Sequence, residues 1–546
     1  MPAPLQIAFT NEQELIGVAL ALIGNRTLLS RQERVATSGI RASHSAELVG
    51  ATCLAIKAGH DPLGDALTHL RTAKDRRALG AVYTPPIIIR SMIAWSAAQS
   101  EPARVVDPGA GTGRFLVAAA AKFPRASLIG IELDPVAALL LRANITTLRL
   151  QRRAKIIVGD YRSSPLPDIN GRTLYIGNPP YVRHHDISKE WKDWYGKAAA
   201  SFRVPGSKLA GLHMHFYLRT LQLAKHGDFG VFITSSEWLD VNYGQTLRSL
   251  LVGKLGGASL HVLEPGAMPF ADAMTTGAIA CFRIGEPSPS MCVRAVPTIE
   301  MLNGLSFGTP VLRAKLDKAQ RWSVIVKPTA APPPGFIELG ELCAVHRGQV
   351  TGANSIWIAS DAASNLPERV LRPTVTRARE IIAANGVLRA PDKLRRVIDL
   401  PSDFDEFSSS ELLRVKEFLR WAKYRGAADG YVAQHRRAWW AVRLYDPAPI
   451  VCTYMGRRPP EFARNLCGAR HINIAHGLYP RDTLTKAELT ALVAYLRRAV
   501  RVSSGRTYAG GLTKFEPKEL ERIPIPPLAQ LLHESTAHLG SRAAHH

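Results

Sequence analysis

Four polar residues each follow a strand-like run, and their types and spacing predict a ligand site. Asp107 ends RVVD, and Glu132 stands 25 residues later in SLIGIEL. Asp160 follows after another 28 residues, and Asn178 ends LYIGN 18 residues beyond it. A carboxylate at the position of Glu132 accepts hydrogen bonds from both ribose hydroxyls of a nucleoside. Any one of these residues alone is explained as a helix cap or a solvated strand end, but four in register indicate a nucleoside-type site.

A glycine-rich turn follows the first of these strands, in VVDPGAGTGRFLVAAA. Gly109, Gly111 and Gly113 let the backbone bend tightly and approach a ligand closely. The last glycine of a dinucleotide fingerprint is replaced by Arg114, and no later strand supplies a recognisable nicotinamide site. A nucleoside without phosphates, such as S-adenosylmethionine, suits such a turn with several carboxylates.

The elements that would position these residues alternate between strand and helix. Strand-like runs such as AKIIVGD and GVFITS are separated by helical stretches such as GRFLVAAAAKF and MHFYLRTLQLAKH. This alternation predicts an α/β fold, with helices on both faces of a mostly parallel sheet. Residues 1–75 carry helix-like patterning without comparable strand signals.

Composition narrows the class of protein. The 546 residues are 46% hydrophobic and 21% charged, and they contain no apolar run of about 18 residues, so we expect no membrane association. The N-terminus lacks a secretory pattern, which favours the cytoplasm. The six cysteines form no CxxC pair, and neither a metal site nor a disulfide framework is expected.

The net charge of +24 favours a polyanionic partner, although an Ala- and Arg-rich composition also inflates such a count. The segment 421–510 alone carries 15 Lys and Arg against 5 Asp and Glu. Aromatic residues are interspersed among them, which is typical of a duplex-binding surface, even though single aromatics more often belong to a core. These aromatic residues are Trp439, Trp440, Tyr454, Tyr479 and Tyr508.

Several segments, in order, resemble the gamma-class N6-adenine DNA methyltransferases of bacterial restriction–modification systems. They are GAVYTPPIIIRSMI (80–93), DPGAGTG (107–113), the strand ends at Glu132 and Asp160, NPPY (178–181), the unit at 226–251 and MPFADAMTTGAIACF (268–282). One departure is Gly211-Leu212-His213, where the family often has an acidic-apolar-aromatic trio.

The resemblance implies a Rossmann-like class I methyltransferase domain that binds S-adenosylmethionine, followed by an α+β domain that recognises double-stranded DNA. The implied cofactor-binding residues are Tyr83, Thr84 and Pro85 near the methionine end, Asp107, Gly109, Gly111 and Gly113 in the turn, Glu132 at the ribose and Asp160 at the adenine amino group. The implied catalytic residues are Asn178, Pro179, Pro180 and Tyr181, with Phe270 facing Tyr181 across the substrate base. An ordinary core position is the alternative for Phe270.

NPPY suits methylation of an exocyclic amino group, whose lone pair is delocalised into the ring. The Asn178 side-chain oxygen and the Pro179 carbonyl are the two expected acceptors for its N–H bonds, and the prolines hold them rigidly. The base must leave the duplex, and Tyr181 offers a face for stacking.

The expected domains follow from these assignments. They are an N-terminal helical region (1–75), the catalytic domain (76–285), a connecting segment with the Pro-rich TAAPPPGF linker (286–336), the target-recognition domain (337–528) and a flexible tail (529–546). We place His346, Arg347 and Gly348 in a loop of the fourth segment.

Alternatives remain within and outside this class. The N4 amino group of cytosine is the main alternative target to adenine. The resemblance favours adenine, because cytosine enzymes of this kind more often have Ser at the position of Asn178. RNA or a protein glutamine amide is a further alternative substrate. A combined restriction enzyme is disfavoured because 1–75 lacks an acidic-then-ExK pattern, and intact Asp107, Glu132 and Asn178 argue against an inactive binding protein. We expect a monomer, with any cognate endonuclease encoded separately.

Overall fold

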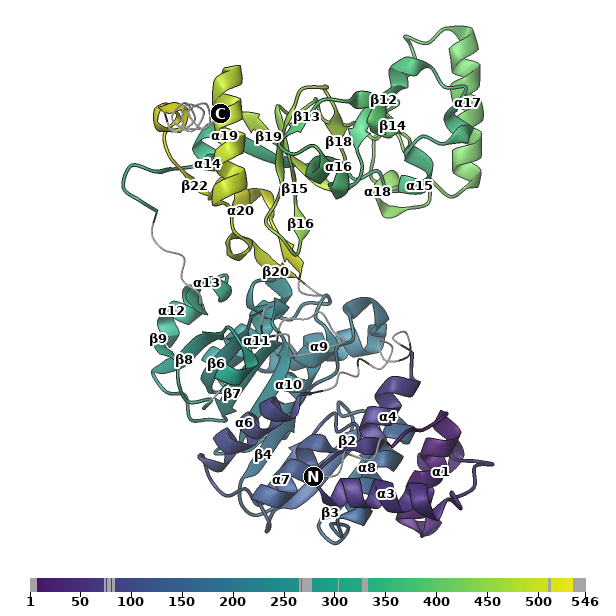
Figure 1. Cartoon of the computed structure of the whole chain (residues 1–546), viewed down its shortest axis with the longest axis vertical. Coiled ribbons are helices and arrows are strands. Elements are labelled where there is room, and N and C mark those ends of the chain that lie inside the picture. The colour runs from purple at the N-terminus through teal and green to yellow at the C-terminus, as the bar shows by residue number, and fades with distance from the viewer. Residues whose placement is uncertain are drawn as a thin grey trace, which may run out of the picture. The chain divides into compact units, whose positions relative to one another are not determined.

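The computed structural model describes residues 7–72, 75, 80, 84–264, 267, 277–302, 304–326, 332–508 and 512–533. The chain forms two compact units (Figure 1). The first comprises Met1–Pro328 with Ala509–Gly511, and the second comprises Thr329–Tyr508 with Leu512–His546. Tyr83, Phe270 and residues 329–331 of the Pro-rich linker lie outside the described residues.

The first unit is built on a nine-stranded sheet of order β3-β2-β1-β4-β5-β7-β6-β8-β9. Its strands are β1 (Arg104–Asp107), β2 (Ser127–Glu132), β3 (Ala154–Val158), β4 (Thr173–Gly177), β5 (Phe229–Ser235), β6 (Gly257–Leu263), β7 (Gly277–Arg283), β8 (Ser290–Val296) and β9 (Thr309–Leu312). The first five are parallel, and β7 runs antiparallel to both β5 and β6.

The strand order of this sheet reverses at one point. β1 pairs with β2 on one side and with β4 on the other, so the order reverses between β1 and β4. Open α/β sheets bind ligands outside the carboxyl ends of the strands at such a switch point. Asp107 and Asn178 stand at this point, because they lie at the ends of β1 and β4.

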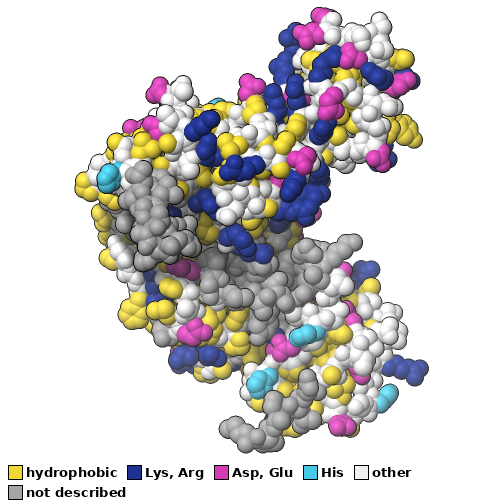
Figure 2. All heavy atoms as spheres, turned by 45° about the horizontal axis from the view of Figure 1, so that its top comes forward, with side chains coloured by type: hydrophobic (Ala, Val, Ile, Leu, Met, Phe, Trp, Pro, Cys, Tyr) yellow, Lys and Arg dark blue, Asp and Glu magenta, His cyan; other side chains and the backbone are white. Residues whose placement is uncertain are grey.

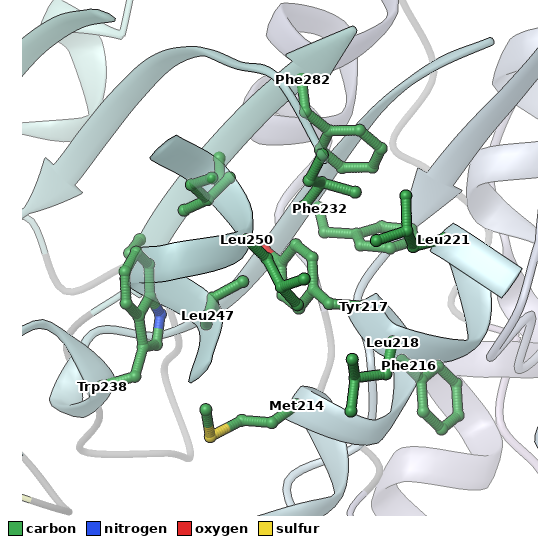
Figure 3. Packing of buried hydrophobic residues seen from close by; sticks show 14 of the residues in the cluster. Met214, Phe216, Tyr217, Leu218, Leu221, Phe232, Trp238, Leu247, Leu250 and Phe282 are labelled. Carbon is green, nitrogen blue, oxygen red and sulfur yellow. The ribbon is translucent and has the colours of Figure 1, made fainter. Parts of the chain in front are cut away.

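Helices cover both faces of the sheet, which is why its central strands are continuous apolar runs. The helices are α6 (Pro86–Ala97), α7 (Arg114–Lys122), α8 (Pro135–Thr147), α9 (Lys189–Ser201), α10 (Leu212–Leu223), α11 (Gln245–Val252), α12 (Arg313–Lys318) and α13 (Ser323–Val326). One core joins α6 and α7 to the sheet, and the other joins α9, α10 and α11 to its opposite face. In the second core the Tyr217 ring lies 5.2 Å from that of Phe232, edge to face (Figure 3).

Four short N-terminal helices pack on the outer side of α8, as the helical patterning predicted. They are α1 (Glu12–Ile23), α2 (Arg31–Ala36), α3 (Ala46–Lys57) and α4 (Pro62–Leu70). Side chains of Asn11, Ser30, Ser45 and Asp61 cap them. Leu15 and Val18 share a core with Leu139 and Leu140, while Leu141 of the same helix faces the sheet core. The helix α8 is therefore buried on two sides.

The second unit is an α+β domain with one larger sheet and several small ones. Its helices are α14 (Leu339–Leu342), α15 (Asn354–Trp357), α16 (Ala378–Ala383), α17 (Ser409–Tyr424), α18 (Tyr431–Gln434), α19 (Lys486–Ala499) and α20 (Pro517–Glu521). Its strands are β10 (Ile337–Glu338), β11 (Cys343–Arg347), β12 (Leu371–Val375), β13 (Val387–Leu388), β14 (Arg396–Ile398), β15 (Ile450–Thr453), β16 (Met455–Gly456), β17 (Phe462–Asn465), β18 (Arg470–His471), β19 (Ala475–Pro480), β20 (Arg506–Tyr508), β21 (Leu512–Lys514) and β22 (Pro524–Ile525). The larger sheet has the order β11-β19-β15-β17-β13.

One local prediction is wrong in this unit. His346 and Arg347 do not lie in a loop but form the end of β11, paired with Gly477 and His476 of β19. The glycine beside them suggested a loop, but the backbone pairing with β19 extends the strand as far as Arg347, and only Gly348 lies beyond it.

Neither unit offers a helix both long and apolar enough to cross a bilayer, as far as the described residues go. Within that part of the chain no group of three or more His, Cys, Asp or Glu side chains has the arrangement of a metal site. All six cysteines are free thiols.

Candidate active site

Asp107 ends β1 as a fully buried carboxylate. Its Oδ1 accepts a long hydrogen bond of 3.4 Å from the Gly109 N–H, and its Oδ2 has no partner among the described residues. Burial raises the pKa of Asp107 well above its ordinary value; the Gly109 N–H opposes this increase and the charge of Glu132 adds to it. A buried acceptor without a partner is costly in the protein alone, so this oxygen is suited to accept a hydrogen bond from a ligand.

Two glycines of the turn after Asp107 have backbone conformations that favour glycine. Gly111 and Gly113 have φ angles of +51° and +95°, a region that side chains with a Cβ rarely adopt. Gly109 lies near the NPPY corner, because a Cβ there would stand at ordinary van der Waals distances of 3.5 Å from the Pro180 ring and 3.8 Å from the Asn178 carbonyl oxygen. The glycine turn and the NPPY corner are therefore close neighbours.

Glu132 is fixed by backbone donors from two segments. Its Oε2 accepts from the Gly111 N–H at 2.8 Å, and its Oε1 accepts from the Asp134 N–H at 2.9 Å. Burial raises the pKa of Glu132, although these backbone hydrogen bonds oppose the increase. Each carboxylate oxygen keeps acceptor capacity for a further donor, as binding a pair of ribose hydroxyls requires.

Asp160, two residues beyond β3, is bound by its neighbour Arg162. Its carboxylate accepts from the Arg162 backbone N–H at 2.8 Å, from Nε at 2.9 and 3.1 Å and from Nη2 at 2.5 Å. The same guanidinium lies over the Trp191 ring, with Cζ 3.9 Å from the ring centroid. The hydrogen bonds to Asp160 involve three N–H groups, because the Nε–H is shared between both oxygens, so a carboxylate with about four acceptor positions keeps room for one further donor.

The NPPY corner begins where β4 ends. The Asn178 Nδ2 donates to Thr84 Oγ1 at 3.0 Å, which fixes the orientation of the amide. Its Oδ1 is buried and has no hydrogen-bond partner in the part of the chain that the structure describes. The Tyr181 N–H donates to the Gly80 carbonyl at 3.0 Å, so the corner is held to the segment that precedes α6.

Tyr181 lies beside His213, which the predicted site did not include. The two ring centroids are 6.4 Å apart, and burial lowers the pKa of His213 to about 4. His213 occupies the aromatic position of the trio in which Gly211 replaces an acidic residue. A Cβ on Gly211 would stand 3.1 Å from the His213 ring, so a glycine leaves room for that ring. The trio was the signal in the sequence that could have identified His213.

The structure brings most of the predicted site residues together. Direct contacts link Asp107 to Gly109, Gly111 to Glu132, and Asn178 to Thr84. Pro85 is the N-cap residue of α6, and Pro86 is the first residue of that helix. Tyr83 and Phe270 are outside the described residues, and their proposed roles stay predictions.

The aromatic residues of the basic segment in the second unit have mainly structural surroundings. Trp439 packs on Trp357, and Trp440 stacks on Phe404 at 5.4 Å and donates its Nε1–H to a backbone carbonyl. The Tyr479 hydroxyl donates to the Asp446 carbonyl at 2.7 Å. Lys and Arg side chains remain exposed across this unit in the view of Figure 2. Exposed rings accompany this charge, because Tyr424, Tyr431 and Tyr445 of the same segment are exposed.

Known proteins match both units of the chain. Residues 170–255 match the family described as Eco57I restriction-modification methylase, and residues 328–543 match the Type II methyltransferase M.Eco57I, C-terminal domain. The DNA complex of the type IIL restriction-modification enzyme MmeI superimposes with a TM-score of 0.59 at 12% identity, covering 97% of this chain and 82% of that one. The fold is that of a Rossmann-like class I methyltransferase with an additional C-terminal α+β domain, as predicted.

Sequence relatives define the family within this class. The type II methyltransferase M.XamI of Xanthomonas campestris pv. amaranthicola is 52% identical over 530 residues, which is 96% of this chain and all of that protein. M.AccI of Acinetobacter calcoaceticus, also a type II methyltransferase, is 19% identical over 82% of this chain and 85% of its own. The chain belongs to the type II methyltransferases of restriction–modification systems.

Proposed function

We propose that this methyltransferase transfers a methyl group from S-adenosylmethionine to the N6 amino group of adenine in duplex DNA. The observation that carries the proposal is the NPPY corner, which lies close to the glycine turn and contains a buried Asn178 Oδ1 without a described partner. Such an oxygen is an acceptor fixed in advance, which is what stabilisation of an amine nucleophile requires.

The residues around the turn fit the proposed cofactor. Asp107 offers an unpartnered buried oxygen, and Glu132 offers oxygens held by two backbone N–H groups. An added Cβ on Gly111 would meet nothing within 4 Å, so the turn presents open backbone at this point. When bound there, S-adenosylmethionine supplies an electrophilic sulfonium methyl group. Asp160 would accept from the adenine amino group at the acceptor position that Arg162 leaves open.

The chain's own residues would act on the target amine. The Asn178 Oδ1 and the Pro179 carbonyl accept its two N–H bonds, which makes the nitrogen more tetrahedral and localises its lone pair. Thr84 keeps the amide oxygen aimed at the amine, because it holds Nδ2. This arrangement needs no strong base beforehand, and alignment with the methyl group contributes much of the remaining acceleration.

We further propose that the target base leaves the duplex and stacks on Tyr181. Unstacking costs a few kcal/mol, and one aromatic platform offsets about 1–3 kcal/mol of this. Gly80 and His213 support Tyr181 through its backbone and its ring, respectively. Phe270 is the proposed partner on the other side of the base.

Duplex DNA is supported as the substrate by charge and by the relatives. The chain carries a net charge of +24, and MmeI was solved in complex with DNA. We propose that the second unit recognises the target sequence, with Lys and Arg side chains holding phosphates. N4-cytosine is the alternative target, since its amino group has the same chemistry and the same two acceptors would serve it.

Replacing Asn178 tests the catalytic role. We expect Asn178→Ala to lower methyl transfer by at least 100-fold, while the dissociation constant for S-adenosylhomocysteine changes less than threefold. Unchanged turnover would refute the role of Asn178. Sequencing of modified bases in DNA from cells that express the wild-type chain identifies the target base. Methylated N4-cytosine in that DNA would replace adenine as the proposed target. Unmodified DNA together with modified RNA would overturn the proposal that DNA is the substrate.

A further inference from the structure

Asp61, at the start of α4, is the centre of a network that reaches the glycine turn. Its Oδ2 accepts from the Thr112 hydroxyl at 2.6 Å and from Arg114 Nε at 2.7 Å. Its Oδ1 accepts from the Gly64 N–H at 3.0 Å and from Asn144 Nδ2 at 3.2 Å. One carboxylate thus joins the N-terminal helices to the turn and to α8.

The contacts of Asp61 fall on the end of the turn that closes the proposed cofactor site. Thr112 and Arg114 flank Gly113, whose φ of +95° reverses the backbone at the start of α7. The Thr112 carbonyl accepts from Asn144 Nδ2 at 2.9 Å, so both the backbone and the side chain of Thr112 are held. Arg114 replaces the glycine of a dinucleotide fingerprint, and its pairing with Asp61 gives that replacement a role.

A second contact from the same helical region reaches the loop that carries Glu132. Arg71, just after α4, pairs with Asp134 Oδ2 and with Glu12. Asp134 Oδ1 caps α8 by accepting from the Val136 N–H at 3.0 Å, and the Asp134 N–H donates to Glu132. With Asp134 held on both sides, its N–H is fixed toward the carboxylate proposed to bind the ribose.

We propose that Asp61 and Arg71 are positioning residues for the cofactor, and that the N-terminal helical region holds both the glycine turn and the Glu132 loop in their binding geometry. The inference rests on the proposed S-adenosylmethionine site. It gives residues 7–72 a function in ligand binding, in addition to covering α8.

Loss of the Asp61 charge removes the carboxylate that accepts from Arg114 Nε at 2.7 Å, while Asp65, which accepts from Nη2, has a side chain that is 56% exposed. Removal of one partner of a largely buried ion pair is destabilising, so we expect the Arg114 guanidinium to move toward water and to shift the first turn of α7. We expect Asp61→Asn to weaken S-adenosylhomocysteine binding about tenfold, which corresponds to about 1.4 kcal/mol.

The test is calorimetric titration of the full-length protein with S-adenosylhomocysteine, which requires neither DNA nor turnover. The matched control is Glu33→Gln. Glu33 is a fully buried carboxylate in the same helical region, and Asp61 is 13% exposed. Glu33 binds Arg142 of α8 through two hydrogen bonds of 2.9 Å and has no hydrogen bond to a proposed cofactor element among the described residues. Thermal melting without ligand shows whether the two variants lose comparable stability.

The inference is supported if Asp61→Asn raises the dissociation constant about tenfold while Glu33→Gln keeps it within twofold of wild type. Non-additive losses in Asp61→Asn, Arg114→Gln and the double variant would support coupling through the turn. An unchanged dissociation constant for Asp61→Asn, or an equal loss for Glu33→Gln, would overturn it without touching the proposed function. Absence of binding by the wild-type protein would overturn the proposed cofactor site, and this inference with it.

Discussion

Gly177 couples the two strand ends that form the candidate site. A Cβ at this last residue of β4 would stand 2.5 Å from Asp107 Oδ1 and 3.4 Å from the Pro108 ring. Real Cβ contacts do not fall below 3.0 Å, so in Gly177→Ala the carboxylate must retreat by about 0.5 Å or more. Because a misplacement of about 1 Å costs up to about 100-fold in a preorganised site, we expect cofactor affinity to fall about tenfold.

The neighbouring strand provides a control of the same kind. Gly159 precedes Asp160 as Gly177 precedes Asn178, but an added Cβ there meets only Ser164 Oγ, at 3.7 Å. Titration of wild type, Gly177→Ala and Gly159→Ala with S-adenosylhomocysteine, together with thermal melting, separates loss of affinity from loss of stability. The reasoning fails if Gly177→Ala binds as tightly as wild type, or if Gly159→Ala is impaired to the same degree.

Two further predictions concern the surroundings of the NPPY corner. Thr84→Val removes the acceptor for Asn178 Nδ2, so we expect kcat to fall about tenfold while KM for the cofactor stays unchanged. Thr84→Ser keeps a hydroxyl acceptor and should restore kcat. If the valine variant is as active as wild type, Thr84 does not orient the Asn178 amide. Burial lowers the pKa of His213 to about 4 and of His215 to about 3, both below the ordinary 6.5. The unfolded state therefore binds more protons than the folded state between about pH 4 and 6.5. The free energy of unfolding, measured in urea titrations, should fall by about 1–2 kcal/mol per histidine from pH 7 to pH 5. If replacing both histidines with Gln leaves this pH dependence unchanged, the two histidines are not its cause.

The strand ends of the catalytic unit could be predicted because the signals are local. Apolar runs of four to seven residues define buried parallel strands, and a polar residue directly after each run falls at the same sheet edge. The glycine turn and the proline corner are equally local, since each depends on the backbone freedom of a few adjacent residues. Order along the chain then sufficed to place Asp107, Glu132 and Asn178 at the same edge of the sheet.

Contacts between segments far apart in sequence were not predictable in this way. Asp61 and Thr112 are 51 residues apart, and no periodicity links a helix-capping aspartate to a cofactor turn. The pairing of Asp160 with Arg162 is local, but a carboxylate at a strand end gives no indication whether an arginine or a ligand occupies it. In the second unit, His346 and Arg347 extend a strand only because β19 supplies a partner.

The double burial of α8 has a consequence for how such enzymes can be divided or recombined. A fragment that starts near residue 76 would expose Leu139, Leu140 and Ala143 to water, although each is fully buried in the intact chain. Such a fragment should aggregate, whatever the quality of its sheet. Exchange of segments between homologous enzymes should therefore succeed only when no crossover point falls between α1 and the end of α8, so that the N-terminal helices and α8 are inherited together.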